Sequence, residues 1–185
     1  MPVTLEQLLQ SRDNRAKHQK DLLDSHPGRS LLCMTVQLPG PEKRNKYSLA
    51  IAQAGVEAIR KAFSLEYEEL KDLETGYEGF FLVPLPAEEA KRLACRIEDT
   101  HPLGRLMDID VLFADAQAGE KWFFGLPHEK YFSPALSLSR GDIGLEPRRC
   151  LLCGNEVRYC MRAKTHTTAE LLARMEEMVK VCCDF

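Results

Sequence analysis

Two aspartates separated by a single residue, Asp108 and Asp110, are the strongest candidates for chemistry in this sequence. They lie in the apolar segment 106–113 (LMDIDVLF), which has the length and composition of a β-strand. Because successive side chains on a strand point to opposite faces, both carboxylates should share one face, about 7 Å apart along the chain. Such a pair repels itself unless a cation lies between the two groups, and oxygen ligands at this spacing suit Mg²⁺ together with substrate phosphates. The pair therefore predicts a metal-dependent phosphoryl or nucleotidyl transfer centre; the alternative is a half-exposed strand whose polar face carries two aspartates.

The residues immediately before this strand have the chemistry to bind an anion. Residues 101–105 (HPLGR) predict a tight turn, which would place backbone amides near Gly104 and the guanidinium of Arg105 beside the carboxylates. Arginine offers a forked set of donors for phosphate oxygens. Taken singly, Arg105 is better explained as a counter-ion for the aspartate pair, and His101 as a histidine satisfied within its loop. The cluster as a whole favours an anionic substrate.

A second group of candidate ligands lies near the C-terminal end. Cys150, Cys153, Cys160 and His166 follow the spacing Cys-x2-Cys-x6-Cys-x5-His. Tetrahedral Zn²⁺ binds Cys3His sets, and a Cys-x2-Cys turn can hold one metal ion with both thiolates. The gap before Cys160 is shorter than in most zinc fingers. The segment is therefore either a structural zinc site or a set of reduced cysteines without a metal. A thioredoxin-like redox role is disfavoured, because the Cys-x2-Cys motif follows a loop rather than a strand.

The same segment, residues 148–166, is basic although the chain as a whole is not. It contains five cationic residues and one acidic residue, a local net charge of +4. Arg162, Lys164 and His166 cluster beyond the last cysteine and are candidates for binding phosphate oxygens, unless the run is only a solvated face. Lys43, in a charged loop between a predicted strand and a predicted helix, is a weaker candidate for the same role.

Composition and charge exclude several classes of protein. The 185 residues are 44% hydrophobic and 29% charged, which is ordinary for a globular chain of one-domain size. A net charge of −3 gives no reason to expect a nucleic-acid partner. The first twenty residues lack the apolar run of a signal peptide, and no segment approaches the roughly 20 apolar residues of a membrane span. We therefore expect a cytoplasmic protein with no membrane partner, in which the seven cysteines are reduced or bind metal.

Hydrophobic periodicity predicts an α+β fold in which a mixed or antiparallel sheet is flanked by helices. Helices are expected over residues 5–23, 47–63, 87–99 and 168–181, and strands over 31–38, 65–73, 79–85 and 106–113. Residues 120–126 are predicted to pair with the last of these strands as a hairpin, and 127–147 to form an irregular loop. The whole chain, 1–185, is expected to be a single domain.

Several motifs together resemble one known family, the apo-citrate lyase phosphoribosyl-dephospho-CoA transferases, also called citrate lyase holo-acyl-carrier-protein synthases. The resemblance rests on HPLGRLMDIDV from His101, PRRCLLC from Pro147 and CMRAKTH from Cys160, and extends to the stretch 8–15 (LLQSRDNR) and to the loop around Lys43. It covers nearly the whole chain. The core 104–111, with its two aspartates, is the most specific part.

The resemblance implies a nucleotidyltransferase-like fold and a defined reaction. Such an enzyme would transfer the phosphoribosyl-dephospho-CoA group from 2′-(5″-triphosphoribosyl)-3′-dephospho-CoA to a serine of the citrate lyase acyl carrier protein, the γ subunit, and release pyrophosphate. Asp108 and Asp110 would hold Mg²⁺, and Arg105 with Arg162, Lys164 and His166 would contact phosphate oxygens.

Other functions are compatible with parts of this pattern. The corresponding transferase for the malonate decarboxylase carrier protein carries a similar paired-aspartate motif. A metal-dependent nuclease or phosphohydrolase would use the same carboxylates with water as the nucleophile. A non-catalytic zinc-binding interaction module would need only the cysteine cluster.

Overall fold

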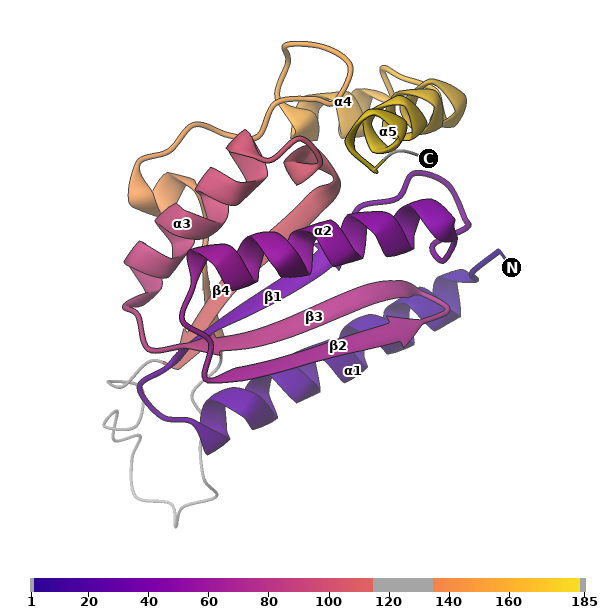
Figure 1. Cartoon of the computed structure of the whole chain (residues 1–185). Coiled ribbons are helices and arrows are strands. Elements are labelled where there is room, and N and C mark those ends of the chain that lie inside the picture. The colour runs from indigo at the N-terminus through magenta and orange to yellow at the C-terminus, as the bar shows by residue number, and fades with distance from the viewer. Residues whose placement is uncertain (1, 115–134, 184–185) are drawn as a thin grey trace, which may run out of the picture.

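The computed structural model describes residues 2–114 and 135–183, which form an antiparallel sheet with helices on both faces (Figure 1). Its strands are β1 (Ser30–Val36), β2 (Tyr67–Leu73), β3 (Gly76–Val83), β4 (Met107–Ala114) and β5 (Ala135–Leu138). Its α-helices are α1 (Leu5–Ser25), α2 (Lys46–Ala62), α3 (Ala87–Thr100), α4 (Val157–Ala163) and α5 (Thr168–Cys183). The α+β class is confirmed, and the sheet is antiparallel rather than mixed. No helix in the described ranges is both long and apolar enough to cross a membrane.

The strands run in the order β2-β3-β1-β4-β5, so β1 lies at the centre of the sheet. It pairs on one side with β3 and on the other with β4, where Thr35 lies opposite Asp108 and Cys33 opposite Asp110. Only the second half of β4, from Val111 onward, pairs with β5. The first half of β4, which carries both aspartates, therefore has one edge without a neighbouring strand among the described residues.

The sheet separates two hydrophobic cores. Alternate residues of β1 and β4, such as Met34 and Ile109, face a core shared with α2, α3 and α5. The opposite face of the sheet packs against α1 through Leu22 and Leu23, and Figure 1 shows α1 and α2 on opposite sides of the strands. Because strand residues alternate between faces, the aspartates point to the side of the sheet on which α1 lies.

The N-terminal ends of α1 and α2 are capped by residues of the local sequence. Thr4 accepts a hydrogen bond from the amide of Gln7, and the Gln7 side chain accepts one from the Thr4 amide, so the two residues form a capping box at the start of α1. Asn45 caps α2 in the same reciprocal way with Ser48. These caps satisfy amides that a helix N-terminus would otherwise leave without partners.

One prediction for the C-terminal half is wrong. Residues 127–147 were expected to be irregular, but Ala135–Leu138 forms β5 and Gly141–Ile143 forms the short 3-10 helix η3. A four-residue edge strand containing serine leaves almost no periodic signal, because its residues are only partly buried. The predicted hairpin strand 120–126 lies outside the described residues.

Candidate functional site

The two aspartates lie on β4 in the alternation that the sequence predicts. Met107, Ile109 and Val111 are buried in the core, whereas Asp108 is partly exposed and Asp110 is exposed. Both carboxylates therefore project from one face of the same strand.

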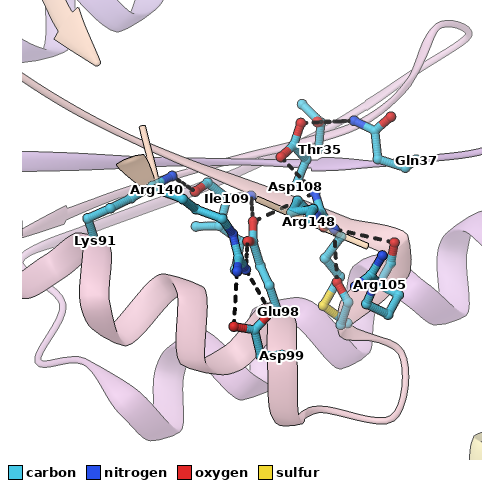
Figure 2. Close-up of polar contacts among 12 residues, drawn as sticks. Thr35, Gln37, Lys91, Glu98, Asp99, Arg105, Asp108, Ile109, Arg140 and Arg148 are labelled. Carbon is cyan, nitrogen blue, oxygen red and sulfur yellow. Dashed lines mark hydrogen bonds and ion pairs between the residues drawn. The ribbon is translucent and has the colours of Figure 1, made fainter. Parts of the chain in front are cut away.

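A cation already accompanies Asp108, and it comes from a distant part of the chain. Arg148 donates from Nη1 to Asp108 Oδ1 at 3.0 Å, and Gln37 donates from Nε2 to Oδ2 at 3.2 Å (Figure 2). The second guanidinium nitrogen of Arg148 donates to the carbonyls of Met107 at 2.7 Å and Arg105 at 3.3 Å. Arg148 thus binds the carboxylate and the backbone of the strand together.

Asp110 has fewer hydrogen-bond partners than Asp108 within the described structure. Its carboxylate accepts no hydrogen bond from any residue that the structure describes, and it keeps contact with solvent. Its pKa is nevertheless raised, first because neighbouring protein atoms remove part of its hydration and second because Asp108 repels its charge. A partly desolvated, unpartnered carboxylate beside a second one attracts a cation.

Side chains of α3 supply hydrogen-bond partners to the backbone at the open edge of β4. Glu98 accepts a hydrogen bond from the Ile109 amide at 2.8 Å, and Lys91 donates to the Ile109 carbonyl at 3.1 Å. Arg140 donates to the other Glu98 oxygen at 2.8 Å. Both α3 side chains are almost fully buried, so they replace the missing strand partner at the residue between the two aspartates.

The sequence analysis missed Lys91 and Glu98, although a signal was available. They are seven residues apart, or about two helical turns, so they lie on the same side of α3 as the buried Ala94. Two charges on the apolar side of a helix are unusual, because a buried charge needs a partner. That pattern marks α3 as the support of a polar site.

Gly104 and Arg105 precede β4 in the 3-10 turn η1 (Gly104–Leu106). A side chain on Gly104 would lie 2.5 Å from the Ile97 carbonyl oxygen and 2.6 Å from that of Glu98, so the turn packs directly onto the end of α3. The Arg105 side chain has no hydrogen-bond or ion-pair partner in the described part of the chain. Burial, and then the neighbouring Arg148, lower its pKa. Arg148, rather than Arg105, is thus the counter-ion that contacts Asp108.

Lys43 lies in the loop that follows β1. Its ammonium donates to the Leu38 carbonyl, and burial lowers its pKa. The end of β1 is joined to η1 by a 2.8 Å bond from the Gln37 amide to the Leu106 carbonyl. Lys43 therefore belongs to the same end of the sheet as Asp108.

Helix α1 brings a further cation to the face that carries the aspartates. Arg15 donates to the buried Glu78 at 2.9 Å, and Ser11 contacts the same carboxylate at 3.3 Å. The charge of Arg15 also acts to lower the pKa of Asp110, against the larger effects that raise it. A cavity of about 450 Å³ opens between α1 and the β2–β3 hairpin beside these residues. Ser11 and Arg15 entered the sequence analysis only as part of the resemblance.

The four predicted zinc ligands converge. One ligand atom from each of Cys150, Cys153, Cys160 and His166 lies within 4.8 Å of all the others. The Cys153 sulfur is 3.5 Å from that of Cys160 and 3.4 Å from His166 Nε2. Hydrogen bonds lower the pKa of the Cys153 thiol to about 6, first from the Asn155 backbone and then from His166. The cluster therefore has the composition and proximity to bind a metal ion.

The remaining predicted phosphate ligands lie apart from the aspartates in the described structure. Arg162 is exposed on α4, Lys164 is the C-cap of that helix, and His166 belongs to the cysteine cluster. None of the three contacts Asp108 or Asp110 within the described ranges. Among the described residues, hydrogen bonds and ion pairs join this segment to the carboxylates only through Arg148.

Comparisons with known proteins agree with the motifs. A family described as apo-citrate lyase phosphoribosyl-dephospho-CoA transferase matches residues 3–181. Relatives with that name from Shigella boydii serotype 18, Escherichia coli O157:H7 and Shigella sonnei are each 35% identical over 182 residues, which span 96% of this chain and 88% of the relative. This chain therefore belongs to the apo-citrate lyase phosphoribosyl-dephospho-CoA transferase family.

Proposed function

We propose that this protein is a nucleotidyltransferase that modifies the citrate lyase acyl carrier protein, the γ subunit. It transfers the phosphoribosyl-dephospho-CoA group from 2′-(5″-triphosphoribosyl)-3′-dephospho-CoA to a serine of that carrier. The names of its relatives support the transferred group and citrate lyase as the acceptor. The observation in this chain that best supports nucleotidyl transfer is the presence of Asp108 and Asp110 on one face of β4, with Asp110 left without a hydrogen-bonding partner among the described residues.

The reaction exchanges one phosphorus–oxygen bond for another. The serine oxygen forms a bond to the α-phosphorus of the triphosphate, the bond from that phosphorus to the pyrophosphate oxygen breaks, and the hydroxyl proton is released to solvent. Little covalent chemistry is required of the protein, so positioning and charge compensation supply most of the catalysis.

Asp108 and Asp110 fit Mg²⁺ because they offer hard oxygen ligands from one strand face. Burial, and then repulsion by Asp108, raise the pKa of Asp110, and a bound cation would offset both effects. Mg²⁺ bound there would polarise the reacting phosphate and lower the pKa of the serine hydroxyl. Arg105 and Lys43 lie at the same end of the sheet, and we assign them, with the backbone at Gly104, to the donor phosphates. An antiparallel sheet with paired aspartates on one strand supports a nucleotidyltransferase-like fold.

The C-terminal segment has a structural and a docking role in this proposal. The cysteine cluster holds a structural Zn²⁺, supported by its Cys3His composition. Helix α5 packs into the core of α2 and α3, which supports a single domain over 1–185.

Helix α4 is the proposed docking surface for the carrier protein. Tyr159 and Met161 are 61% and 72% exposed, which is unusual for large apolar side chains. Arg158, Arg162 and Lys164 surround them, and their side chains have no hydrogen-bonding or ion-pairing partner within the described ranges. A surface that combines apolar area with unpaired cations fits an acidic partner, as carrier proteins often are.

Reversing one charge on this surface tests the docking role. The substitution Arg162→Glu is expected to raise KM for the carrier by about tenfold, with little change in kcat, because a charge at the rim of an interface mainly affects association. The effect should shrink as salt is added. Arg96→Glu, an exposed arginine of α3, is the matched control. An equal rise in KM for both variants would show that net charge matters rather than α4.

Mass spectrometry of the carrier tests the proposed reaction directly. Apo carrier protein is incubated with the enzyme, the triphosphate donor and Mg²⁺, and its intact mass is compared with that of a sample without Mg²⁺. We expect an increase equal to the phosphoribosyl-dephospho-CoA group only in the presence of Mg²⁺. Modification of the malonate decarboxylase carrier instead would assign the alternative transferase, and hydrolysis of the donor without any modified carrier would assign a phosphohydrolase.

A further inference from the structure

Arg148 is the only residue in the described structure that joins the cysteine-rich segment to the aspartate pair by hydrogen bonds. Its side chain is 18% exposed and contacts Asp108 together with the carbonyls of Met107 and Arg105. Three charge-assisted hydrogen bonds of this kind require the forked guanidinium to be held in one orientation. Whatever fixes the backbone of Arg148 therefore influences the site around Asp108.

The backbone of Arg148 begins the hairpin that carries the first two cysteines. The carbonyl of Arg148 accepts from the Val157 amide at 2.9 Å, and the Cys150 amide donates to the Asn155 carbonyl at 2.7 Å. Between these bonds, Arg149 and Glu156 form an isolated antiparallel bridge. Arg148 and the ligand Cys150 are thus two residues apart on one short, tightly bonded hairpin.

No residue of the hairpin from Arg149 to Glu156 is fully buried, and Leu151 is its one side chain that packs against the main core within the described structure. Cys160 is the only buried residue of α4, and the cysteines of the described segment form no disulfide. Ligands on the hairpin, on α4 and after α4 meet within 4.8 Å. A tetrahedral zinc site with bonds of about 2.3 Å places its sulfur ligands about 3.8 Å apart, close to the observed 3.5 Å between Cys153 and Cys160. Metal binding would therefore cross-link the hairpin to α4 and to the segment after it, which the contact of Leu151 with the core does not do.

We propose that a metal ion in the Cys150, Cys153, Cys160 and His166 cluster holds Arg148 in place on Asp108, so that the cluster controls the geometry of the aspartate site. Arg148 is a positioning residue: it orients one carboxylate and offsets part of the repulsion between the two. Loss of the metal releases the hairpin, Arg148 leaves β4, and the carboxylates lose their arrangement. The consequence for catalysis rests on the proposed nucleotidyl transfer, whereas the structural link does not.

Metal content and trypsin cleavage test the link without any substrate. The purified full-length protein is expected to hold about one Zn²⁺ per chain, and Co²⁺ in its place should show thiolate-to-cobalt absorption. Trypsin cleaves after arginine, so removal of the metal should speed cleavage after Arg148 or Arg149 by at least about tenfold as the hairpin opens. Returning Zn²⁺ alone should restore protection.

Two cysteine variants separate the cluster from cysteines in general. Cys153→Ser is expected to lose the metal and the protection of Arg148, whereas Cys182→Ser, an exposed cysteine outside the cluster, should keep both. Because Cys153→Ser could fail to fold, the metal-free and reloaded wild-type protein provides the same comparison without a substitution. A chain that binds no zinc or cobalt, or whose cleavage after Arg148 is the same with and without metal, overturns the proposal.

Substitution of Arg148 tests the positioning role. Arg148→Gln is expected to lower kcat for carrier modification by about 100-fold with little change in KM for the carrier, and Arg148→Lys to recover only part of it, because an ammonium lacks the fork. Both variants should keep their zinc. Full activity in the zinc-free wild type or in Arg148→Gln would overturn the positioning role of Arg148 and leave the proposed function intact. If zinc protects the bond after Arg148 from trypsin but the protein modifies no carrier, the proposed function is overturned and the link between the metal cluster and Arg148 stands.

Discussion

Asp110→Asn is expected to reduce carrier modification by about 10³-fold or more while leaving the protein at least as stable as the wild type. A lost metal ligand removes several kcal/mol of charge stabilisation in the transition state, and each 1.4 kcal/mol is about tenfold in rate. Stability should not fall, because Asp110 accepts no hydrogen bond within the described structure and its raised pKa shows that its charge is unfavourable in the folded protein. The measurements are the rate of mass increase of the carrier and the urea midpoint of the variant.

The pH dependence of that stability gain has a definite sign. A carboxyl whose pKa is raised by folding penalises the native state when both states are ionised, and the penalty disappears below the ordinary pKa of the unfolded chain. In metal-free protein, the advantage of Asp110→Asn over the wild type should therefore be largest near pH 7. It should shrink as the pH falls through the range in which Asp110 becomes protonated and vanish well below the ordinary aspartate pKa of about 3.9.

Two controls distinguish a lost ligand from a lost fold. Asp21→Asn removes an exposed carboxylate of α1 and should change neither activity nor stability measurably. Asp108→Asn should also abolish transfer, but with some loss of stability, because Asp108 accepts hydrogen bonds from Arg148 and Gln37. If Asp110→Asn unfolds, or transfers at the wild-type rate, Asp110 is not a metal ligand. The aspartate pair would then be only the polar face of a half-exposed strand.

Local patterns in the sequence predict those parts of the site that depend on neighbouring residues. Alternation along β4 is enough to place Asp108 and Asp110 on one face, because the side-chain period of a strand is two. The capping box at Thr4 is equally local. The cysteines are also close together in the sequence, so their spacing is enough to predict that they converge around one point.

Contacts between distant segments could not be predicted in this way. Arg148 is 40 residues from Asp108, and the sequence analysis counted it only as part of a basic run and of the motif PRRCLLC, with Arg105 as the candidate counter-ion. The distance in sequence between Arg148 and Asp108 does not indicate that β4 has an open edge beside Asp108. The edge depends on how far β5 extends, and β5 itself is too short to be recognised. Which cation contacts which carboxylate is thus decided by the packing of the sheet.

Glu98 is the least exposed charged residue that the structure describes, and its loss should destabilise the fold strongly. Its side chain is 3% exposed, accepts from the Ile109 amide at 2.8 Å and from Arg140 at 2.8 Å, and lies 3.9 Å from Arg148. Glu98→Ala leaves the Ile109 amide without its acceptor and two guanidinium groups without a shared anion. Removing one member of a buried charged network costs about 3–5 kcal/mol in the free energy of unfolding.

Two further variants divide that cost between charge and hydrogen bonding. Glu98→Gln can still accept from the Ile109 amide, so it should lose only about 1–3 kcal/mol. Glu89→Ala removes an exposed carboxylate from the first turn of the same helix and should cost about 1 kcal/mol or less. Urea unfolding of the three variants measures the free energies. If Glu98→Ala costs no more than Glu89→Ala, Glu98 does not hold the open edge of β4, and the position of the aspartates must be set by the other contacts of β4, such as those with β1 and Arg148.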